Sequence, residues 1–337
     1  MGGAVLFCVA LATSTAASYG VARWLRSAGF VDRPGLGRIH LTITPRGGGV
    51  AVAVGFLAAL IVGQTVQRLG VDRDTQGPLA VSVGTATAAA IGLLDDRLGL
   101  SIPTQAVLVA SLGLLAAAQG VVLESAHGDE LRIVGYLPLA VLETVTVLGL
   151  TVTSVNLLDG IDGLSSSVVA GAALGLALLG MRYAPPNSSQ LVVGSLSLAG
   201  ATVGFLLLNW PPARIHTGTA GVFAMSYALV ALAATAQMSD AMLVLLAAPL
   251  SETVWTIPRR LAARRRFTSR DLGHLHHLMQ LRFGPSGALV FYLAESGLLL
   301  TALLVTPRGD WWGLLAVGIA VNGIGLVALR RYELPIR

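Results

Sequence analysis

The chain lacks lysine altogether and has a single cysteine, Cys8, among its 337 residues. One thiol excludes an internal disulfide, and the missing lysine excludes a lysine as catalytic or phosphate-binding group. Only 12% of the residues are charged, about half the share in an average soluble domain, whereas 54% are hydrophobic and 40 are glycine. No water-facing surface hides that much apolar side chain, and close helix packing in membranes favours glycine, so the composition indicates an integral membrane protein.

Eleven apolar segments approach the length of about 20 residues that a helix needs to cross a bilayer. They are residues 4–25, 48–66, 79–97, 103–122, 136–156, 164–183, 190–209, 219–237, 241–258, 287–306 and 311–329. The sequence therefore predicts an all-α polytopic membrane protein with about 11 transmembrane helices, forming one integral membrane domain over residues 1–337. We interpret the first segment as a retained span, because no cationic region precedes it.

The basic residues are all arginine, and they are divided unevenly between the loops. Seventeen lie in one alternating set of loops and five in the other. The positive-inside rule places the arginine-rich set in the cytoplasm, with the N-terminus outside and the C-terminus cytoplasmic. The predicted cytoplasmic loops are 26–47, 94–102, 156–163, 209–218 and 258–286. Membrane orientation thus accounts for the net charge of +5, and we expect no nucleic acid partner.

The first of these loops ends in Pro45-Arg46-Gly47-Gly48-Gly49, directly before an apolar segment. Glycines at the mouth of a helix can let backbone N–H groups approach an anion. They can equally form a turn that lets two helices pack closely. The residues alone leave both interpretations open.

Paired carboxylates occupy the next two loops. Asp95 and Asp96 stand at a membrane boundary, where carboxylates must be solvated, paired or bound to a metal. Asp159 and Asp162 are three residues apart, so one face of a helical turn would carry both. Magnesium binds a few carboxylates together with phosphate oxygens, and a carboxylate can also act as general base. The structural alternatives are an ion pair with Arg97 and an ordinary loop.

The last two loops supply turns, arginines and histidines. The fourth begins at Asn209, contains two prolines and ends in a Gly-Thr-Ala-Gly turn in which Thr219 can cap the next helix. The fifth has an arginine run, typical of lipid-headgroup contacts, followed by His274, His276 and His277. These histidines can ligate a metal, stabilise an anion or transfer a proton. Adjacent histidines face different directions, which argues against a three-histidine zinc site.

In this order, the motifs resemble the polyprenyl-phosphate N-acetylhexosamine-1-phosphate transferases of the MraY and WecA types (glycosyltransferase family 4). The motifs are Asp32-x-Pro…His40…Pro45-Arg46-x-Gly-Gly, Leu93-Leu94-Asp95-Asp96-Arg97, Asn156-Leu-x-Asp159-Gly-x-Asp162-Gly163-Leu164, Asn209-x-Pro-Pro-Ala213 and His274-x-His276-His277. Carboxylates, cations and glycine-rich turns on one face are also what magnesium-assisted handling of a phosphate ester requires. The histidine pattern and the eleven spans are closer to the WecA branch.

The resemblance implies transfer of N-acetylhexosamine-1-phosphate from a UDP-sugar to undecaprenyl or another polyprenyl phosphate. The products would be a lipid-diphospho-sugar and UMP, serving cell-wall, peptidoglycan or surface polysaccharide synthesis. The reaction would take place at the cytoplasmic face of the cell membrane with Mg²⁺, or Mn²⁺, as cofactor. The implied partners are the polyprenyl phosphate lipid and the UDP-N-acetylhexosamine, and the resemblance is compatible with a homodimer.

The resemblance also implies roles for single residues. The catalytic ones would be Asp95, Asp96, Asp159, His276 and His277. Substrate would be bound by Asn156, Asp162, Asn209, His216, His274, Arg46 and His40. Metal would be bound by Asp96 and Asp95, with Thr219 at the third ligand position.

Five polar positions depart from the family pattern. Thr219 stands where the family has a metal-binding aspartate, and His216 where it has an aromatic residue that stacks on uracil. Gln105, Thr153 and Glu252 replace a basic residue, an asparagine and an aspartate. These changes favour either a shifted substrate or a weakened member that binds lipid phosphate or nucleotide sugar without efficient turnover. A transporter is disfavoured, because its ionisable groups should lie mid-span rather than at span ends.

Overall fold

The computed structural model describes residues 2–32, 43–68, 76–123, 137–262, 264 and 273–330. The helices in these ranges are α1 (Gly2–Ser27), α2 (Val50–Arg68), α3 (Gln76–Leu98), α4 (Ile102–Ala118), α5 (Leu137–Leu158), α6 (Leu164–Tyr183), α7 (Ser188–Asn209), α8 (Gly218–Thr235), α9 (Ser239–Leu245), α10 (Ala247–Ala262), α11 (Leu275–Val305) and α12 (Trp311–Leu329). A short 3₁₀ turn, η2 (Arg308–Asp310), precedes α12. The chain is thus an all-α polytopic membrane protein, as the apolar segments predicted, because a lipid-exposed chain must satisfy its backbone polar groups internally.

Each of the eleven predicted segments coincides with a helix or a helix pair. Within the described residues, eight helices are long and apolar enough to cross a membrane: α1, α3, α5, α6, α7, α8, α11 and α12, the last together with η2. Helices α9 and α10 qualify only as a pair, bent by 74° at the break between them. Helix α4 and the Val50–Thr65 part of α2 are apolar but shorter. The count of about eleven spans therefore stays a prediction.

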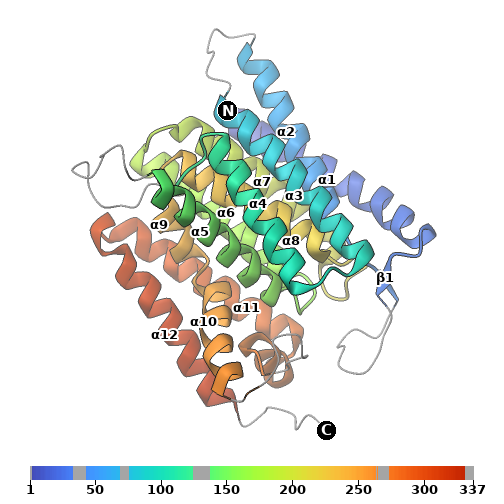
Figure 1. The fold of residues 1–337 in the computed structure, drawn as a ribbon, viewed down its shortest axis with the longest axis vertical. Helices are drawn as coiled ribbons and strands as arrows, with labels where there is room; N and C mark the ends of the chain where they lie inside the picture. Colours follow the sequence, from blue (N-terminus) through green and yellow to red (C-terminus); the bar gives the residue numbers. More distant parts are fainter. Residues whose placement is uncertain are drawn as a thin grey trace.

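Helix α8 forms the centre of the bundle. Its sequence is apolar on all sides, which is typical of a helix surrounded by others, and nearly all of its residues are buried. It packs against α3 and α5, while α1 packs against α7 and α2 (Figure 1). Helices α10, α11 and α12 pack together as a second group, in which α10 also packs against α5 and α11 against α6.

Glycine allows the first residues of α8 to touch their neighbours backbone to backbone. A Cβ atom built at Gly49 would lie 2.0 Å from the Cα atom of Gly221. The backbone N–H groups of Gly48 and Gly49 donate to the carbonyls of His216 and Thr217, both at 2.9 Å. Because these N–H groups already have acceptors, the glycines serve close packing here, which is the second of the two interpretations left open by the sequence.

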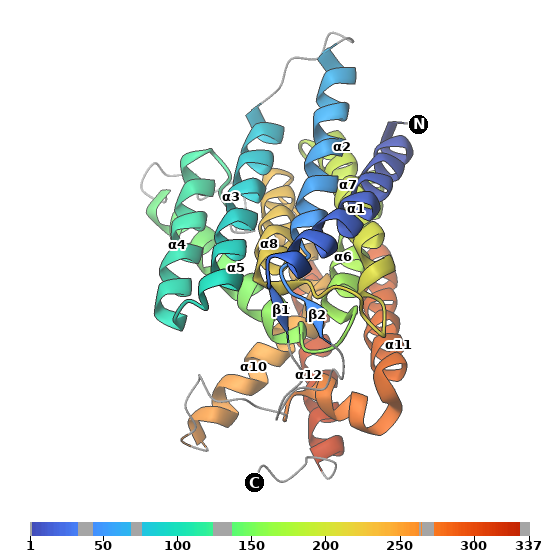
Figure 2. The same cartoon turned by 90° about the vertical axis from the view of Figure 1, so that its right-hand side faces the viewer.

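Two short strands that the sequence did not predict lie beside this contact. Strands β1 (Val31–Asp32) and β2 (Thr44–Pro45) pair antiparallel, with Val31 opposite Pro45. The next residue, Arg46, forms a parallel bridge with His216. Figure 2 shows β1 and β2 at the end of the bundle from which α10 projects. The first and fourth predicted loops are therefore joined at one end of the bundle.

Candidate active site

A cavity of about 720 Å³ opens at this end of the bundle. Its size is typical of a pocket for a small-molecule substrate. Polar residues from the first, third and fourth predicted loops and from the start of α11 line it: Asp32, Thr44, Arg46, Asn156, Asp159, Asp162, Asn209, His216, Thr217, Thr219, Gln280 and Ser286. Residues far apart in the sequence thus converge on one site.

Asp96 of α3 lies behind this lining, at the N-terminus of α8, where it contacts the lining residues Arg46 and Thr219. Its Oδ1 atom accepts the N–H of Thr219 and its Oδ2 atom accepts the N–H of Ala220, each at 3.0 Å. Arg46 donates its Nε–H to Oδ1, also at 3.0 Å. The carboxylate has no exposed surface, whereas the arginine side chain is 45% exposed. The helix N-terminus and the guanidinium together stabilise a buried negative charge.

Asp95 faces the other way. Its Oδ1 atom accepts the backbone N–H of Leu100 at 3.0 Å and the side-chain amide of Gln105 at 2.9 Å. Arg97, which the sequence offered as an ion-pair partner, lies over the ring of Phe30 at 5.9 Å. The two aspartates therefore have different roles. Asp95 stabilises the turn after α3, and Asp96 joins α3 to the N-terminus of α8.

These residues do not fit a magnesium ion in this arrangement. Magnesium requires oxygen ligands that converge on one octahedral position. The carboxylates of Asp95 and Asp96 diverge, and that of Asp96 already accepts three donors, one of them a cation. Thr219 lines the cavity but brings no charge. Asp95, Asp96 and Thr219 therefore do not form a metal site in this structure.

The turn between α5 and α6 carries two carboxylates into the cavity lining. Ser165 donates its hydroxyl to Oδ1 of Asp159 at 2.5 Å. Burial raises the pKa of Asp159 from 3.8 to about 6, although the hydrogen bond from Ser165 opposes that rise. Asp162 accepts the N–H of Ala213 at 2.9 Å, which ties the third loop to the fourth. A carboxyl that titrates near neutral pH is a suitable proton acceptor.

His216 stands between two carboxylates at the edge of the cavity. Its Nδ1 atom is 3.7 Å from Oδ2 of Asp32, and its Nε2 atom is 3.6 Å from Oδ1 of Asp162. These long contacts place the imidazole between the two carboxylates, at the position where the family resemblance implies an aromatic ring. The cavity therefore keeps a flat ring at this place, but one that can carry a charge.

Asn209 shapes the fourth loop and also borders the cavity. Its side-chain amide donates to the carbonyl of Ile215 at 2.9 Å, and its Oδ1 atom accepts the hydroxyl of Ser166 at 3.0 Å. Asn156 lines the cavity as an exposed residue. His40 lies outside the described residues.

The three histidines lie behind the cavity wall rather than in its lining. His274 and His276 are buried, and His277 is half-buried. A Cβ atom built at Gly160 would lie 2.8 Å from Nε2 of His276 and 2.9 Å from Cε1 of His277. Gly160 belongs to the cavity lining, so the imidazoles support the turn that carries Asp159.

The sequence did not single out Gln280 and Ser286, which line the cavity from α11. The Oε1 atom of Gln280 is buried and has no hydrogen-bond partner among the residues that the structure describes. One signal was available, since Gln280 follows His276 and His277 by four and three residues and so shares a helix face with them.

Comparison with known proteins supports the resemblance seen in the motifs. The family model for glycosyl transferase family 4 matches residues 78–237. The chain is 26% identical, over 334 residues, to a probable undecaprenyl-phosphate N-acetylglucosaminyl 1-phosphate transferase of Bacillus subtilis (strain 168), covering 96% of this chain and 90% of that protein.

Two phospho-N-acetylmuramoyl-pentapeptide-transferases match over shorter stretches. That of Moorella thermoacetica is 32% identical over 146 residues, covering 42% of this chain and 44% of its own length. That of Clostridium botulinum (strain Eklund 17B / Type B) is 38% identical over 103 residues, covering 31% and 30%. This chain thus matches less than half the length of either transferase. Together with the ordered motifs, these matches support the resemblance of the chain to the polyprenyl-phosphate N-acetylhexosamine-1-phosphate transferases of glycosyl transferase family 4.

Proposed function

We propose that this chain transfers N-acetylhexosamine-1-phosphate from a UDP-sugar to a polyprenyl phosphate. An oxygen of the lipid phosphate attacks the β-phosphorus of the UDP-sugar, and the bond between that phosphorus and the oxygen bridging to the α-phosphate breaks. UMP leaves with the bridging oxygen, and the lipid keeps the sugar on a diphosphate. One observation carries the proposal: the cavity gathers carboxylates, an imidazole and a half-exposed guanidinium at one end of a membrane bundle.

Each group in the cavity has a chemical part in this reaction. Asp159, with a pKa of about 6, takes the proton that the lipid phosphate gives up as it becomes a nucleophile. Arg46 uses the exposed part of its guanidinium to bind phosphate oxygens, on which negative charge develops in the transition state. His216 offers its ring to the base of the nucleotide. Asn156 and Asp162 bind the remaining polar groups of the UDP-sugar.

The proposed reaction takes place at the cytoplasmic face of the plasma membrane. UDP-sugars are charged, so they need a site open to water, and the cavity lies at the end of the bundle that holds the arginine-rich loops. Seventeen of the 22 arginines fall in that set of loops. Protease cleavage or labelling of tags in these loops, in sealed vesicles of known orientation, tests this placement.

A second candidate is a member that binds the nucleotide sugar but turns it over poorly. The geometry of Asp95, Asp96 and Thr219 favours it, since the family resemblance implies a divalent metal that these three residues do not fit. Purified protein, undecaprenyl phosphate and a panel of UDP-N-acetylhexosamines distinguish the two candidates. Formation of UMP and lipid-diphospho-sugar supports the transferase. Calorimetric binding of a UDP-sugar with no product supports the binding protein.

A further inference from the structure

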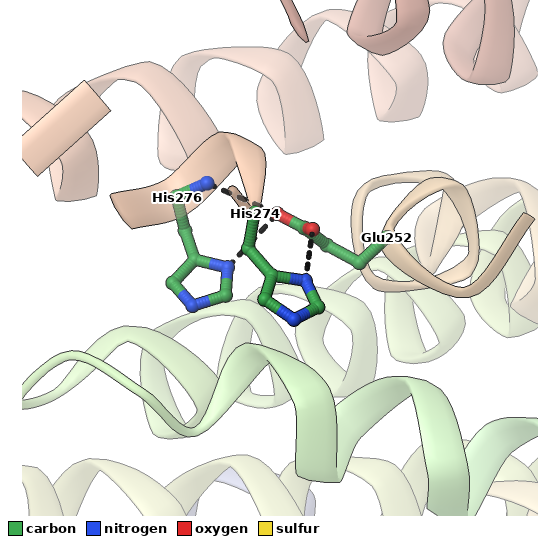
Figure 3. A group of neighbouring side chains, drawn as sticks. All are labelled: Glu252, His274 and His276. Carbon is green, nitrogen blue, oxygen red and sulfur yellow. Dashed lines mark hydrogen bonds and ion pairs between the residues drawn. The ribbon is translucent and has the colours of Figure 1, made fainter. Parts of the chain in front are cut away.

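Beneath the cavity wall, one buried carboxylate holds two imidazoles. Glu252 of α10 places its Oε2 atom 3.1 Å from Nδ1 of His274 and its Oε1 atom 2.9 Å from Nδ1 of His276 (Figure 3). All three side chains are buried, with relative exposures of 4%, 5% and 0%. Both rings therefore turn the same nitrogen toward the carboxylate.

The carboxylate of Glu252 accepts further hydrogen bonds that fix it in place. Its Oε1 atom also accepts the backbone N–H of His276 at 3.0 Å and the hydroxyl of Tyr292 at 3.1 Å. A buried carboxylate is costly unless donors surround it. Because it can only accept, each Nδ1 atom that faces it must carry a proton. Glu252 thus sets which ring nitrogen is protonated in both histidines.

The opposite edge of His276 supports the cavity. Its Nε2 atom lies where a Cβ atom of residue 160 would be only 2.8 Å away. Gly160 sits in the turn between Asp159 and Asp162, which both line the cavity. The orientation of this one imidazole therefore bears directly on the backbone that carries the two carboxylates.

The same three side chains are close enough together to hold a metal ion. The distances of 2.9 and 3.1 Å are ordinary hydrogen-bond lengths, however. The Oε1 atom also already accepts an amide N–H and a phenol. Hydrogen bonding explains each of these contacts without an ion.

We propose that Glu252 is a positioning residue for the transferase reaction, which holds His274 and His276 as Nδ1–H imidazoles and thereby fixes the turn of Asp159 and Asp162. The proposal rests on the function proposed for the cavity. The residue itself does not touch substrate. It acts through the histidines, as the carboxylates behind metal-bound or catalytic histidines commonly do.

The variant Glu252→Gln tests this directly, because an amide keeps the size but offers two hydrogens toward the rings. At least one imidazole must then move its proton to Nε2. We expect kcat to fall by about 10–100-fold, the range for loss of such a partner, with less than about a threefold change in the affinity for UDP. Glu252→Asp keeps a carboxylate, although on a shorter side chain. It should therefore keep His274 and His276 protonated at Nδ1 and retain most of the kcat that Glu252→Gln loses.

Nuclear magnetic resonance of protein with ¹⁵N-labelled histidine shows which ring nitrogen of each histidine carries the proton. A variant that only destabilised the fold would not change that nitrogen. The ring nitrogen shifts of His274 and His276 should report Nδ1–H in the parent and in Glu252→Asp, and an Nε2–H form in Glu252→Gln. Glu295→Gln is the matched control, since Glu295 is a second buried acid, on α11, whose carboxylate accepts the side-chain amide of Asn322. It should leave kcat and both tautomers unchanged.

A second variant approaches the contact from the other side. Gly160→Ala pushes a methyl group toward His276 and His277, so it should lower kcat as Glu252→Gln does while leaving the His274 tautomer in place. Gly297→Ala, where no other atom lies within 4 Å, should have no effect.

Unchanged kcat or unchanged tautomers in Glu252→Gln overturn the proposal. So does one equivalent of bound metal in the purified parent that Glu252→Gln loses, since the cluster is then a metal site. If the parent transfers no sugar phosphate at all, the proposed function fails. The tautomer and UDP-binding measurements still decide whether Glu252 orients the histidines.

Discussion

Replacing Asp159 by asparagine should make the protein more stable and less active. The carboxyl lies in the cavity lining, where burial raises its pKa to about 6. Asparagine has nearly the same shape and can still accept the hydroxyl of Ser165, but it never carries a charge. The charged carboxylate of Asp159 therefore lowers the stability of the fold at neutral pH but is the form that accepts a proton in the reaction. Active sites commonly lose stability in favour of activity in this way.

The size of the gain follows from the two titrations. The carboxyl titrates at 3.8 in the unfolded chain and at about 6 in the folded one. Well below pH 3.8 the carboxyl is protonated in both the folded and the unfolded state, so it does not reduce the free energy of unfolding. As the pH rises through 3.8 and then 6, the unfolded state releases its proton first, so folding stability falls. The total loss is about 3 kcal/mol at pH 7.5 and about 1 kcal/mol at pH 4.5. These are upper limits, since Asp159 is partly exposed to the cavity.

Thermal unfolding in detergent, followed by tryptophan fluorescence at both pH values, measures this difference. We expect Asp159→Asn to raise the midpoint by about 4 °C at pH 7.5 and by about 1–2 °C at pH 4.5. Its transfer rate should fall at least about 100-fold. Asp310→Asn removes an exposed carboxylate and should show no such gain. An Asp159→Asn variant that gains nothing at pH 7.5, or gains equally at both pH values, refutes the reasoning.

Three further variants test the wall of the cavity. Gly49→Ala drives a methyl group into the backbone of Gly221, so purified protein should lose about 3 kcal/mol or fail to accumulate in the membrane. Arg46→Ala leaves the buried carboxylate of Asp96 with backbone donors alone, and should cost about 1–3 kcal/mol in denaturant unfolding and at least about tenfold in transfer rate. Thr219→Asp adds a carboxylate to the cavity lining beside Asp96, so the variant should bind Mg²⁺ at least about tenfold more tightly than the parent does. Equal Mg²⁺ titrations of parent and variant contradict that expectation.

The helices were predictable because the length and apolarity of a segment decide whether it crosses a membrane. The ninth predicted segment is an exception to this rule. The length of its apolar run predicted one span over residues 241–258, whereas the helix axis bends by 74° between α9 and α10. Pro249 lacks the N–H that would bond to the carbonyl of Leu245, so a break is favoured just before it. The hydrophobic run alone does not contain this information.

In the site, the sequence identified polar residues that gather around the cavity but could not assign their partners. Neighbouring residues on a helix are about 100° apart around its axis. Asp95 and Asp96 therefore point to different sides, and Asp96 pairs with Arg46, fifty positions away, rather than with Arg97. Such a pairing depends on how α3 packs beside the segment between β2 and α2, which carries Arg46. The family pattern likewise marked Glu252 of α10 but did not indicate that His276 is its partner.

The most direct test of the proposed reaction is to follow the β-phosphorus of the UDP-sugar. Purified protein receives undecaprenyl phosphate and a UDP-N-acetylhexosamine that carries radioactive phosphorus only at the β-position. We predict that the label appears in the lipid-diphospho-sugar and that one unlabelled UMP forms for each lipid product. Label that leaves as UDP, or a correctly folded protein that forms no labelled lipid with any UDP-N-acetylhexosamine, contradicts the account.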